Sequence, residues 1–318
     1  MYHNFPDMHV LGIDAGGSKT VCLLADGEGN VLAEARGPGA NLQTSGELEV
    51  EKVLHQVIDE AIGDRGVQPQ IVCVGIAGVD RPRDSQALAT IMRRLGFKSG
   101  TLIVNDALVA LVAGAGIGPG LVIVAGTGSI AYGRDAAGRA ARAGGWGYLL
   151  GDEGAGFWIG RLALSAVVRQ FDGRAPDTML TRLVLEHMRL DSPRDLIQVV
   201  YEGGLHRQSM AGVALLVRDA ADGGDAVARD ILARASAELV AAAASVVSKL
   251  EMRGLPFRTV LTGGVFRGMP AMVATVAAGM AEVAPRSEVR CLEVEPALGA
   301  VSLALEAARG RVAVPTYL

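Results

Sequence analysis

The sequence is short of aromatic residues, of cysteines and of basic charge, and each shortage argues against a class of protein. Aromatic residues make up 4% of the 318 residues, so the 50% hydrophobic content rests mainly on alanine, valine and leucine. The three cysteines, Cys22, Cys73 and Cys291, lie far apart in the chain. This spacing predicts free thiols and offers neither a disulfide framework nor a zinc cluster. The net charge of −4 provides no basic field for a nucleic-acid partner.

Long unbroken hydrophobic runs are also scarce. Residues 107–125 are uncharged and approach the roughly 18 residues that a membrane span needs. Several glycines and Pro119 interrupt them, which predicts two separate elements joined by a loop. The first residues have neither the cationic start nor the apolar core of a signal peptide. We therefore expect a cytoplasmic protein with no membrane partner, and its length favours about two domains.

Glycine, by contrast, is abundant, and one glycine-rich turn is the most informative segment. Asp14–Thr20, with the sequence DAGGSKT, separates the apolar runs Val10–Ile13 and Val21–Ala25, which are typical of two strands joined by a tight turn. Paired glycines allow close approach of the backbone to a ligand, and the amides of such a turn can form an anion-binding nest. Asp14, at the end of the first strand, can hold a cation. The turn therefore predicts a site for phosphate with a metal ion.

The same pattern occurs a second time. Leu121–Val124 leads into the turn Ala125–Ser129, with the sequence AGTGS, and a second strand begins at Ile130. A polar turn and a third short strand follow each copy. The repeat returns after roughly 110 residues, close to the length of a domain. It predicts a duplicated architecture with domains at 1–110 and 111–318, helical additions in the second, and a ligand cleft between them.

Hydrophobic periodicity predicts the remaining elements. Ser45 is a plausible N-cap for the first long helix. Helices are expected over 47–62, 85–95, 154–171, 178–188, 194–201, 210–221, 225–250 and 269–283, and a final helix is expected from Pro296 to near Ala308. This final helix is expected to pack back on the N-terminal domain. Further strands are expected over 71–78, 101–106, 259–265 and 288–292.

Two common nucleotide-binding motifs do not fit the glycine turns. A P-loop places Gly-Lys-Ser/Thr at the start of a helix, whereas here Ser18 precedes Lys19 and a strand follows. The Gly126–Gly128 segment lacks the third glycine of a dinucleotide fingerprint and also leads into a strand. Both motifs are therefore excluded.

The turns resemble instead the phosphate-binding turns of the superfamily that contains sugar kinases, heat-shock chaperone ATPases and actin. Asp14–Thr20 resembles its first phosphate loop and Gly126–Ser129 its second. Leu261–Val265 resembles its adenosine motif, and Pro296–Ala300 the helix start that follows. The resemblance implies an α/β fold made of duplicated actin-like ATPase domains of the ribonuclease H-like type.

Residues 144–160, GGWGYLLGDEGAGFWIG, narrow the resemblance to one group. They are similar to the pattern of the N-acetylglucosamine kinase group in the BadF/BadG/BcrA/BcrD family. Asn41, Asn105–Ala107 and Ala211–Gly212 match further positions, and the resemblance extends from Gly12 to about Ala304. It implies an ATP-dependent kinase for the 6-hydroxyl of an amino sugar, N-acetylglucosamine first, with ATP and Mg²⁺ as cofactors.

The resemblance also implies a role for individual residues. Asp106 would be the catalytic base that accepts the proton of the attacking sugar hydroxyl, and Asp14 would hold Mg²⁺ through water. The expected sugar contacts are Asn41, Asp106, Ser129, Gly145, Trp146, Gly147 and Asp152. The expected ATP contacts are Gly16, Gly17, Ser18, Lys19, Thr127, Gly128, Ala211, Gly263 and Gly264.

Several alternatives stay open on the sequence alone. Asp106 could only cap a helix, Asp152 could only brace its glycine turn, and Lys19 could be a solvated hairpin residue. Ile130 stands where some family members have an asparagine that contacts the sugar, which leaves room for glucosamine or another hexose. N-acetylmuramic acid is a further alternative substrate. The sequence also leaves open whether the chain forms a homodimer.

Two other functions are weighed against the kinase. One is the ATPase activator of 2-hydroxyacyl-CoA dehydratases, which shares an iron–sulfur cluster across a dimer; the isolated cysteines do not offer that arrangement. The other is a sugar-sensing regulator without enzymatic activity. The intact Asp106 favours an enzyme over such a regulator.

Overall fold

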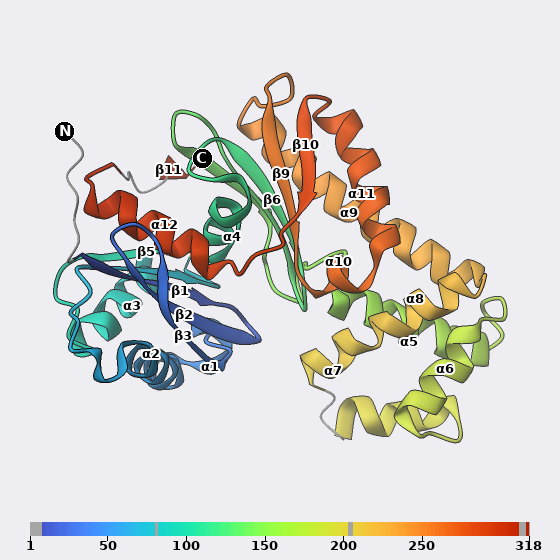
Figure 1. The fold of residues 1–318 in the computed structure, drawn as a ribbon. Helices are drawn as coiled ribbons and strands as arrows, with labels where there is room; N and C mark the ends of the chain where they lie inside the picture. The colour runs from blue at the N-terminus through green and yellow to red at the C-terminus, as the bar shows by residue number, and fades with distance from the viewer. Residues whose placement is uncertain (1–7, 80–81, 203–205, 312–315, 318) are drawn as a thin grey trace. The chain divides into compact units, whose positions relative to one another are not determined.

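A computed structural model describes residues 8–79, 82–202, 206–311 and 316–317. The chain divides into two compact units (Figure 1). Unit 1 comprises residues 1–122, 132–141 and 292–318, and unit 2 comprises residues 123–131 and 142–291. Each unit is therefore assembled from separate stretches of sequence.

Unit 1 is built on a five-stranded sheet. Its strands are β1 (His9–Ala15), β2 (Lys19–Asp26), β3 (Val31–Pro38), β4 (Ile71–Ile76) and β5 (Thr101–Asn105). The order is β3-β2-β1-β4-β5, with β1, β2 and β3 antiparallel and β1, β4 and β5 parallel. The apolar residues of β1, β2 and β4 are almost completely buried, as expected for central strands covered on both faces.

Helices cover both faces of this sheet (Figure 1). They are α1 (Leu42–Ser45), α2 (Glu47–Ile62), α3 (Pro82–Arg94), α4 (Asp106–Ala115) and α12 (Ala297–Ala308). The helix α2 packs on β2 and β3, whereas α12 packs on β1 and α4. The residues of α2 that meet the sheet recur at helical spacing and include Val50, Val53, Leu54 and Val57, the apolar stripe of an amphipathic helix.

The contact between β1 and α12 is unusually close. A Cβ added at Gly12 would lie 2.6 Å from Val301 Cγ2 and 2.7 Å from the carbonyl oxygen of Ala297. Only glycine therefore allows the strand and the helix to meet at this distance. Gly299, on the same helix, approaches the backbone of Val109 in α4 in the same way.

The second sheet repeats the plan of the first. Its strands are β6 (Gly120–Ala125), β7 (Ser129–Arg134), β8 (Arg139–Gly144), β9 (Phe257–Thr262), β10 (Ser287–Cys291) and β11 (Thr316–Tyr317). Their order, β10-β9-β6-β7-β8-β11, contains β8-β7-β6-β9-β10 as the counterpart of β3-β2-β1-β4-β5. The expected duplication of a strand, glycine turn and strand is thereby confirmed.

Unit 2 holds most of the helices of the second half. They are α5 (Gly156–Phe171), α6 (Met179–Met188), α7 (Arg207–Gly212), α8 (Ala214–Asp222), α9 (Ala226–Lys249), α10 (Gly264–Gly268) and α11 (Pro270–Val283). By length and composition α9 alone among the helices of the described residues could cross a membrane. It packs against α5, α8 and α11, and a core helix of a globular domain passes the same test.

Three expectations about local structure were wrong. Gly46, with φ 77°, occupies the N-cap position of α2, and Ser45 is instead the last residue of α1. The helix expected over 194–201 is a 3₁₀ turn at Pro193–Asp195 followed by a π-helical turn at Gln198–Glu202. The helix expected over 210–221 is divided at Val213 into α7 and α8.

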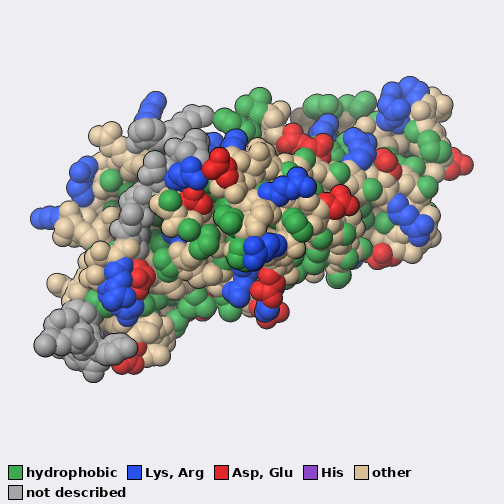
Figure 2. Space-filling model, turned by 90° about the horizontal axis from the view of Figure 1, so that it is seen from above, with side chains coloured by type: hydrophobic (Ala, Val, Ile, Leu, Met, Phe, Trp, Pro, Cys, Tyr) green, Lys and Arg blue, Asp and Glu red, His purple; other side chains and the backbone are tan. Residues whose placement is uncertain are grey.

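The state of the cysteines and the distribution of surface charge are those expected from the composition. Cys22 and Cys73 are buried free thiols and Cys291 is an exposed one; burial raises the pKa of the Cys22 thiol to about 12. Figure 2 shows acidic and basic side chains interspersed over the described part of one face, without a broad area of one sign.

Candidate functional site

Two carboxylates meet at the carboxyl edge of the first sheet. The parallel strands β1, β4 and β5 are in a register that aligns Ala15, Ile76 and Asn105 at this edge. Asp14 stands one residue before the end of β1, and Asp106 directly follows β5. Ligands of open α/β sheets bind at this edge, so the topology places both groups where a substrate is expected.

Asp106 is the first residue of α4 and not its cap. The side chain of Asn105 caps this helix by accepting a hydrogen bond of 2.9 Å from the backbone N–H of Ala107. Asp106 Oδ1 lies 3.0 Å from the same N–H. Because Asn105 fills the N-cap position, capping does not account for the carboxylate of Asp106, which is half-buried.

Asp14 is the most strongly perturbed of these carboxyls. It is 8% exposed, and its pKa is raised to about 7, chiefly by burial and next by the negative charge of Asp106. Lys19 acts in the opposite direction, and Glu295 adds to the rise. A site that crowds negative charge in this way is energetically poised to accept a cation.

The first glycine turn is held by the loop that carries Asn41. Gly16 donates a backbone hydrogen bond of 3.0 Å to the carbonyl of Lys19, and Ala40 donates one of 3.0 Å to the carbonyl of Gly16. A Cβ on Gly39 would lie 2.6 Å from the carbonyl carbon of Gly17. The loop after β3 therefore packs on the turn, which brings Asn41 close to the predicted phosphate-binding residues.

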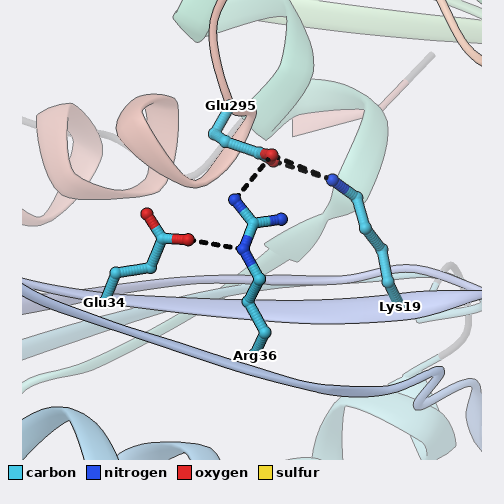
Figure 3. Close-up of polar contacts among 4 residues, drawn as sticks. All are labelled: Lys19, Glu34, Arg36 and Glu295. Carbon is cyan, nitrogen blue, oxygen red and sulfur yellow. Dashed lines mark hydrogen bonds and ion pairs between the residues drawn. The ribbon is translucent and has the colours of Figure 1, made fainter.

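Lys19 is engaged in an ion-pair network (Figure 3). Its Nζ lies 2.8 Å and 3.1 Å from the two carboxylate oxygens of Glu295. Arg36 Nη2 reaches Glu295 Oε1 at 3.0 Å, and Arg36 also pairs with Glu34. Glu295 immediately precedes Pro296 and α12, so the network ties the start of β2 to the start of that helix. Lys19 is therefore more than a solvated hairpin residue.

The second glycine turn rests on the start of α5. Gly126 donates a hydrogen bond of 2.9 Å to the carbonyl of Gly128, which closes the turn. Gly156 donates one of 2.8 Å to the carbonyl of Gly126, and Phe157 donates one of 3.3 Å to that of Thr127. These bonds satisfy two of the N–H groups that a helix start leaves unpaired and fix the turn.

The predicted adenosine residues gather beside this turn. A Cβ on Gly263 would lie 2.9 Å from the backbone nitrogen of Gly126, and one on Gly156 would lie 3.1 Å from Ala211 Cβ. Gly263 has φ 111° and precedes α10, which begins at Gly264. The structure thus brings these residues together, although they are distant in sequence.

Asp152 is the centre of the predicted sugar contacts in unit 2. It is 4% exposed, with φ 59°, a conformation that is strained for a residue other than glycine. It accepts backbone hydrogen bonds from Ser129 and Gly147, yet burial outweighs them and raises its pKa. The oxygens of its carboxylate would touch a Cβ on Gly128, which explains why that position is glycine.

The same cluster contains Gly145. Gly145 donates a hydrogen bond of 2.9 Å to the carbonyl of Ser129, and the Ser129 hydroxyl donates one of 2.7 Å to the carbonyl of Glu153. A Cβ on Gly145 would lie 2.9 Å from Ile130 Cδ1. Ile130 therefore packs directly beside the predicted sugar contacts.

Aromatic residues with stacked arginines flank this cluster. Trp146 is 61% exposed, and the Arg142 guanidinium lies 4.7 Å from the centre of its ring. Arg207 lies 4.7 Å from the ring of Tyr148, and its Nη2 is 3.7 Å from Asp152 Oδ2.

The predicted site residues thus form two groups. Unit 1 holds Asp14, Gly16, Gly17, Ser18, Lys19, Asn41 and Asp106, and unit 2 holds Thr127, Gly128, Ser129, Gly145, Trp146, Gly147, Asp152, Ala211, Gly263 and Gly264. Two charged neighbours were missed from the sequence. Glu295 could have been noticed because it precedes the Pro296 motif, and Arg207 because it stands four residues before Ala211.

The donor set fits a hydrated magnesium ion better than a protein-enclosed one. Mg²⁺ binds through one or two carboxylates and keeps several waters or substrate oxygens. Asp14 and Asp106 are the carboxylates at the sheet edge. No group of three His, Cys, Asp or Glu side chains among the described residues is close enough to enclose a metal.

Comparisons with known proteins identify the family of the chain. The family model described as the BadF/BadG/BcrA/BcrD ATPase family matches residues 11–304. The chain is 37% identical over 265 residues to an N-acetylmuramic acid/N-acetylglucosamine kinase of Clostridium acetobutylicum, with 82% of this chain and 86% of that protein covered. It is 33% identical over 309 residues to an N-acetyl-D-glucosamine kinase of Dictyostelium discoideum, with 93% and 97% covered.

Solved structures share the fold at lower identity. A Chromobacterium violaceum protein, assigned provisionally to the N-acetylglucosamine kinases, matches with a TM-score of 0.74 at 24% identity and covers 94% of this chain and 100% of its own. A ROK-family glucokinase of Streptomyces griseus, solved with glucose and AMPPNP, matches with a TM-score of 0.59 at 18% identity over 95% and 99% of the two chains. The expected actin-like ATPase fold is thereby confirmed.

Proposed function

The chain belongs to the BadF/BadG/BcrA/BcrD ATPase family, and we propose that it phosphorylates the 6-hydroxyl of an amino sugar, N-acetylglucosamine first. It is a sugar kinase of the N-acetylglucosamine kinase type, which uses ATP. The observation that carries the proposal is the pair Asp14 and Asp106 at the carboxyl edge of the first sheet. One is a candidate cation ligand and the other a candidate base.

Asp106 supports the proposed chemistry through its position and its solvent access. It is half-buried at the start of α4, and Asn105 already caps that helix. In the proposed reaction its carboxylate accepts the proton of the sugar hydroxyl as that oxygen attacks the γ-phosphate of ATP. The bond from the γ-phosphorus to the bridging oxygen breaks, and ADP leaves.

Each glycine turn is a proposed phosphate-binding loop of its own unit. The proposed donors are the backbone amides of Gly17 and Ser18 in unit 1 and of Thr127 and Gly128 in unit 2, whereas the amide of Gly16 closes the first turn through its bond to Lys19. Phosphoryl transfer depends mainly on positioning and on neutralisation of charge. When bound, Mg²⁺ supplies charge neutralisation of the phosphates, and Asp14 would hold it through water.

Asp152, Ser129, Gly145, Gly147, Trp146 and Asn41 are the proposed sugar contacts. Ser129, Gly145, Gly147 and Asp152, all from unit 2, are linked by hydrogen bonds, which supports a common role. N-acetylmuramic acid is a second candidate substrate, because one relative is named for both sugars. A cytoplasmic location remains a prediction.

A coupled assay for ADP release tests the proposal directly. Purified protein with ATP and Mg²⁺ is offered N-acetylglucosamine, N-acetylmuramic acid, glucosamine, N-acetylmannosamine and glucose in parallel. We expect sugar-dependent ADP release, with the 6-phosphate of an N-acetylated sugar as product. ATP turnover that stays at background with every sugar would refute a kinase and favour a sugar sensor.

A further inference from the structure

Arg207 places a positive charge beside the carboxylate that the proposed function assigns to sugar binding. It lies on α7 (Arg207–Gly212), and its Nη2 is 3.7 Å from Asp152 Oδ2. Asp152 is nearly enclosed, with 5% of its side chain exposed, whereas 35% of the Arg207 side chain is exposed. The Arg207 side chain is therefore much more accessible than that of Asp152.

The guanidinium is oriented by stacking and not by hydrogen bonds. It lies over the ring of Tyr148 at 4.7 Å, and Tyr148 in turn meets Phe157 edge to face, with ring centres 5.0 Å apart. Arg207 Nε is buried without a hydrogen-bond partner, and Arg207 makes no hydrogen bond to any other residue that the structure describes. The planar fork of donors is thus held in place by stacking, and its one charged partner among the described residues is Asp152, at 3.7 Å.

The candidate sugars differ in charge, so the guanidinium of Arg207 can discriminate between them. N-acetylglucosamine is neutral, glucosamine carries an ammonium group at neutral pH, and N-acetylmuramic acid carries a carboxylate on its lactyl ether. A fork of guanidinium donors binds a carboxylate well and repels an ammonium group. The negative charge of Asp152 alone would favour the ammonium group of glucosamine over the carboxylate of N-acetylmuramic acid. The positive charge of Arg207 favours the carboxylate instead.

We propose that Arg207 is a specificity-determining residue that admits amino sugars bearing a carboxylate substituent. The inference rests on the proposed function, because it assumes that Asp152 contacts the sugar. It predicts that N-acetylmuramic acid is a substrate of this chain, that N-acetylglucosamine is accepted without help from Arg207, and that glucosamine is disfavoured.

The test compares kcat/KM for the three sugars in the wild type, Arg207→Gln and Arg207→Lys. In Arg207→Gln we expect kcat/KM for N-acetylmuramic acid to fall by about 10- to 100-fold, the range for lost hydrogen bonds between charged groups. The value for N-acetylglucosamine should fall by about threefold at most, and that for glucosamine should rise. Arg207→Lys, which keeps the charge, should restore much of the activity on N-acetylmuramic acid.

Arg234 provides a matched control in the same unit. It also lies over an aromatic ring, that of Trp158 at 5.7 Å, and also pairs with an aspartate, Asp230, at 3.7 Å. Arg234→Gln removes the same charge and the same kind of stacking, and should leave the ratio between the sugars as it is in the wild type.

Two outcomes would overturn the inference. One is a wild type that phosphorylates N-acetylglucosamine but not N-acetylmuramic acid. The other is an equal loss on both sugars in a folded Arg207→Gln variant, which would make Arg207 a general support of Asp152. Absence of activity on every sugar would instead refute the proposed function, so the two failures are distinguishable.

Discussion

Replacement of Asp14 with asparagine should stabilise the folded chain at neutral pH while it abolishes phosphoryl transfer. Burial and the charge of Asp106 raise the pKa of Asp14 from 3.8 to about 7. Between these values the unfolded chain has released the proton and the folded chain still holds it. Stability therefore falls as the pH rises, because the folded state binds more protons than the unfolded state. Asparagine has no such proton to lose.

The size of the effect follows from the shift. Each pH unit across which only the folded state is protonated costs about 1.4 kcal/mol. From pH 5 to pH 7 the wild type should thus lose about 2 kcal/mol that Asp14→Asn does not lose, and the difference should level off above about pH 8, where Asp14 is ionised in both states. Below pH 3.8, where both states of the wild type are protonated, the advantage of the variant should vanish.

Urea unfolding at pH 5 and pH 8, without nucleotide or metal, measures this difference. Far-UV circular dichroism is the suitable signal, because both tryptophans, Trp146 and Trp158, lie in unit 2 and do not report on Asp14. Asp26 offers a control with the opposite pH dependence, because hydrogen bonds from Asn30 and Glu28 lower the pKa of its half-buried carboxyl. Asp26→Asn should lower the stability at neutral pH.

The reasoning would be refuted if the stability difference between Asp14→Asn and the wild type were the same at pH 5 and pH 8. It would also be refuted if the variant were less stable than the wild type at pH 8. Addition of Mg²⁺ and ATP supplies a second measurement. It should raise the stability of the wild type by mass action and should have a smaller effect on Asp14→Asn.

Three further predictions concern other parts of unit 1. Asp106→Asn should keep the fold and sugar binding but lower kcat by about 10²- to 10⁴-fold. Coupled ADP release measures kcat, and a sugar titration measures binding. Near-normal turnover would show that Asp106 is not the base. Glu295→Gln removes a negative charge that raises the pKa of Asp14 and leaves Lys19 free to lower that pKa. If ionised Asp14 is needed for activity, the acidic limb of the pH profile of kcat/KM should move to lower pH by a fraction of a unit. Gly12→Ala should lower the free energy of unfolding by about 1–3 kcal/mol through overpacking against α12. Gly17→Ala, where the added carbon would meet open space, should lower it by less in the same urea assay.

Periodicity and glycine placement sufficed to predict most of the fold. The helix over 47–62 was predicted to the residue, because its apolar positions recur regularly and acidic residues occupy its first turn. The break at Val213 directly follows Gly212, a poor helix former, so the sequence did carry a signal for it. The π-helical turn at Gln198–Glu202 contains neither proline nor glycine, so intrinsic propensity gives no warning of it.

The site was predictable as a set of residues but not as a set of contacts. Lys19 could be named from its turn, yet its partner Glu295 is 276 positions away, and no local pattern connects the two. Asp152 could be named from its motif, but its left-handed backbone and its proximity to Arg207 depend on how α7 packs. The roles of these residues in catalysis and binding remain predictions.

The close approach of Gly12 to α12 also dictates an order of events during synthesis. β1 leaves the ribosome early, but the helix that covers it comes nearly 290 residues later, in the stretch from 292 onward that belongs to unit 1. At about 5–20 residues per second, the interval is roughly 15 to 60 seconds. Throughout that time the growing chain carries an uncovered strand face, which a chaperone can bind. Unit 2, contained within residues 123–291, is complete before unit 1 can close.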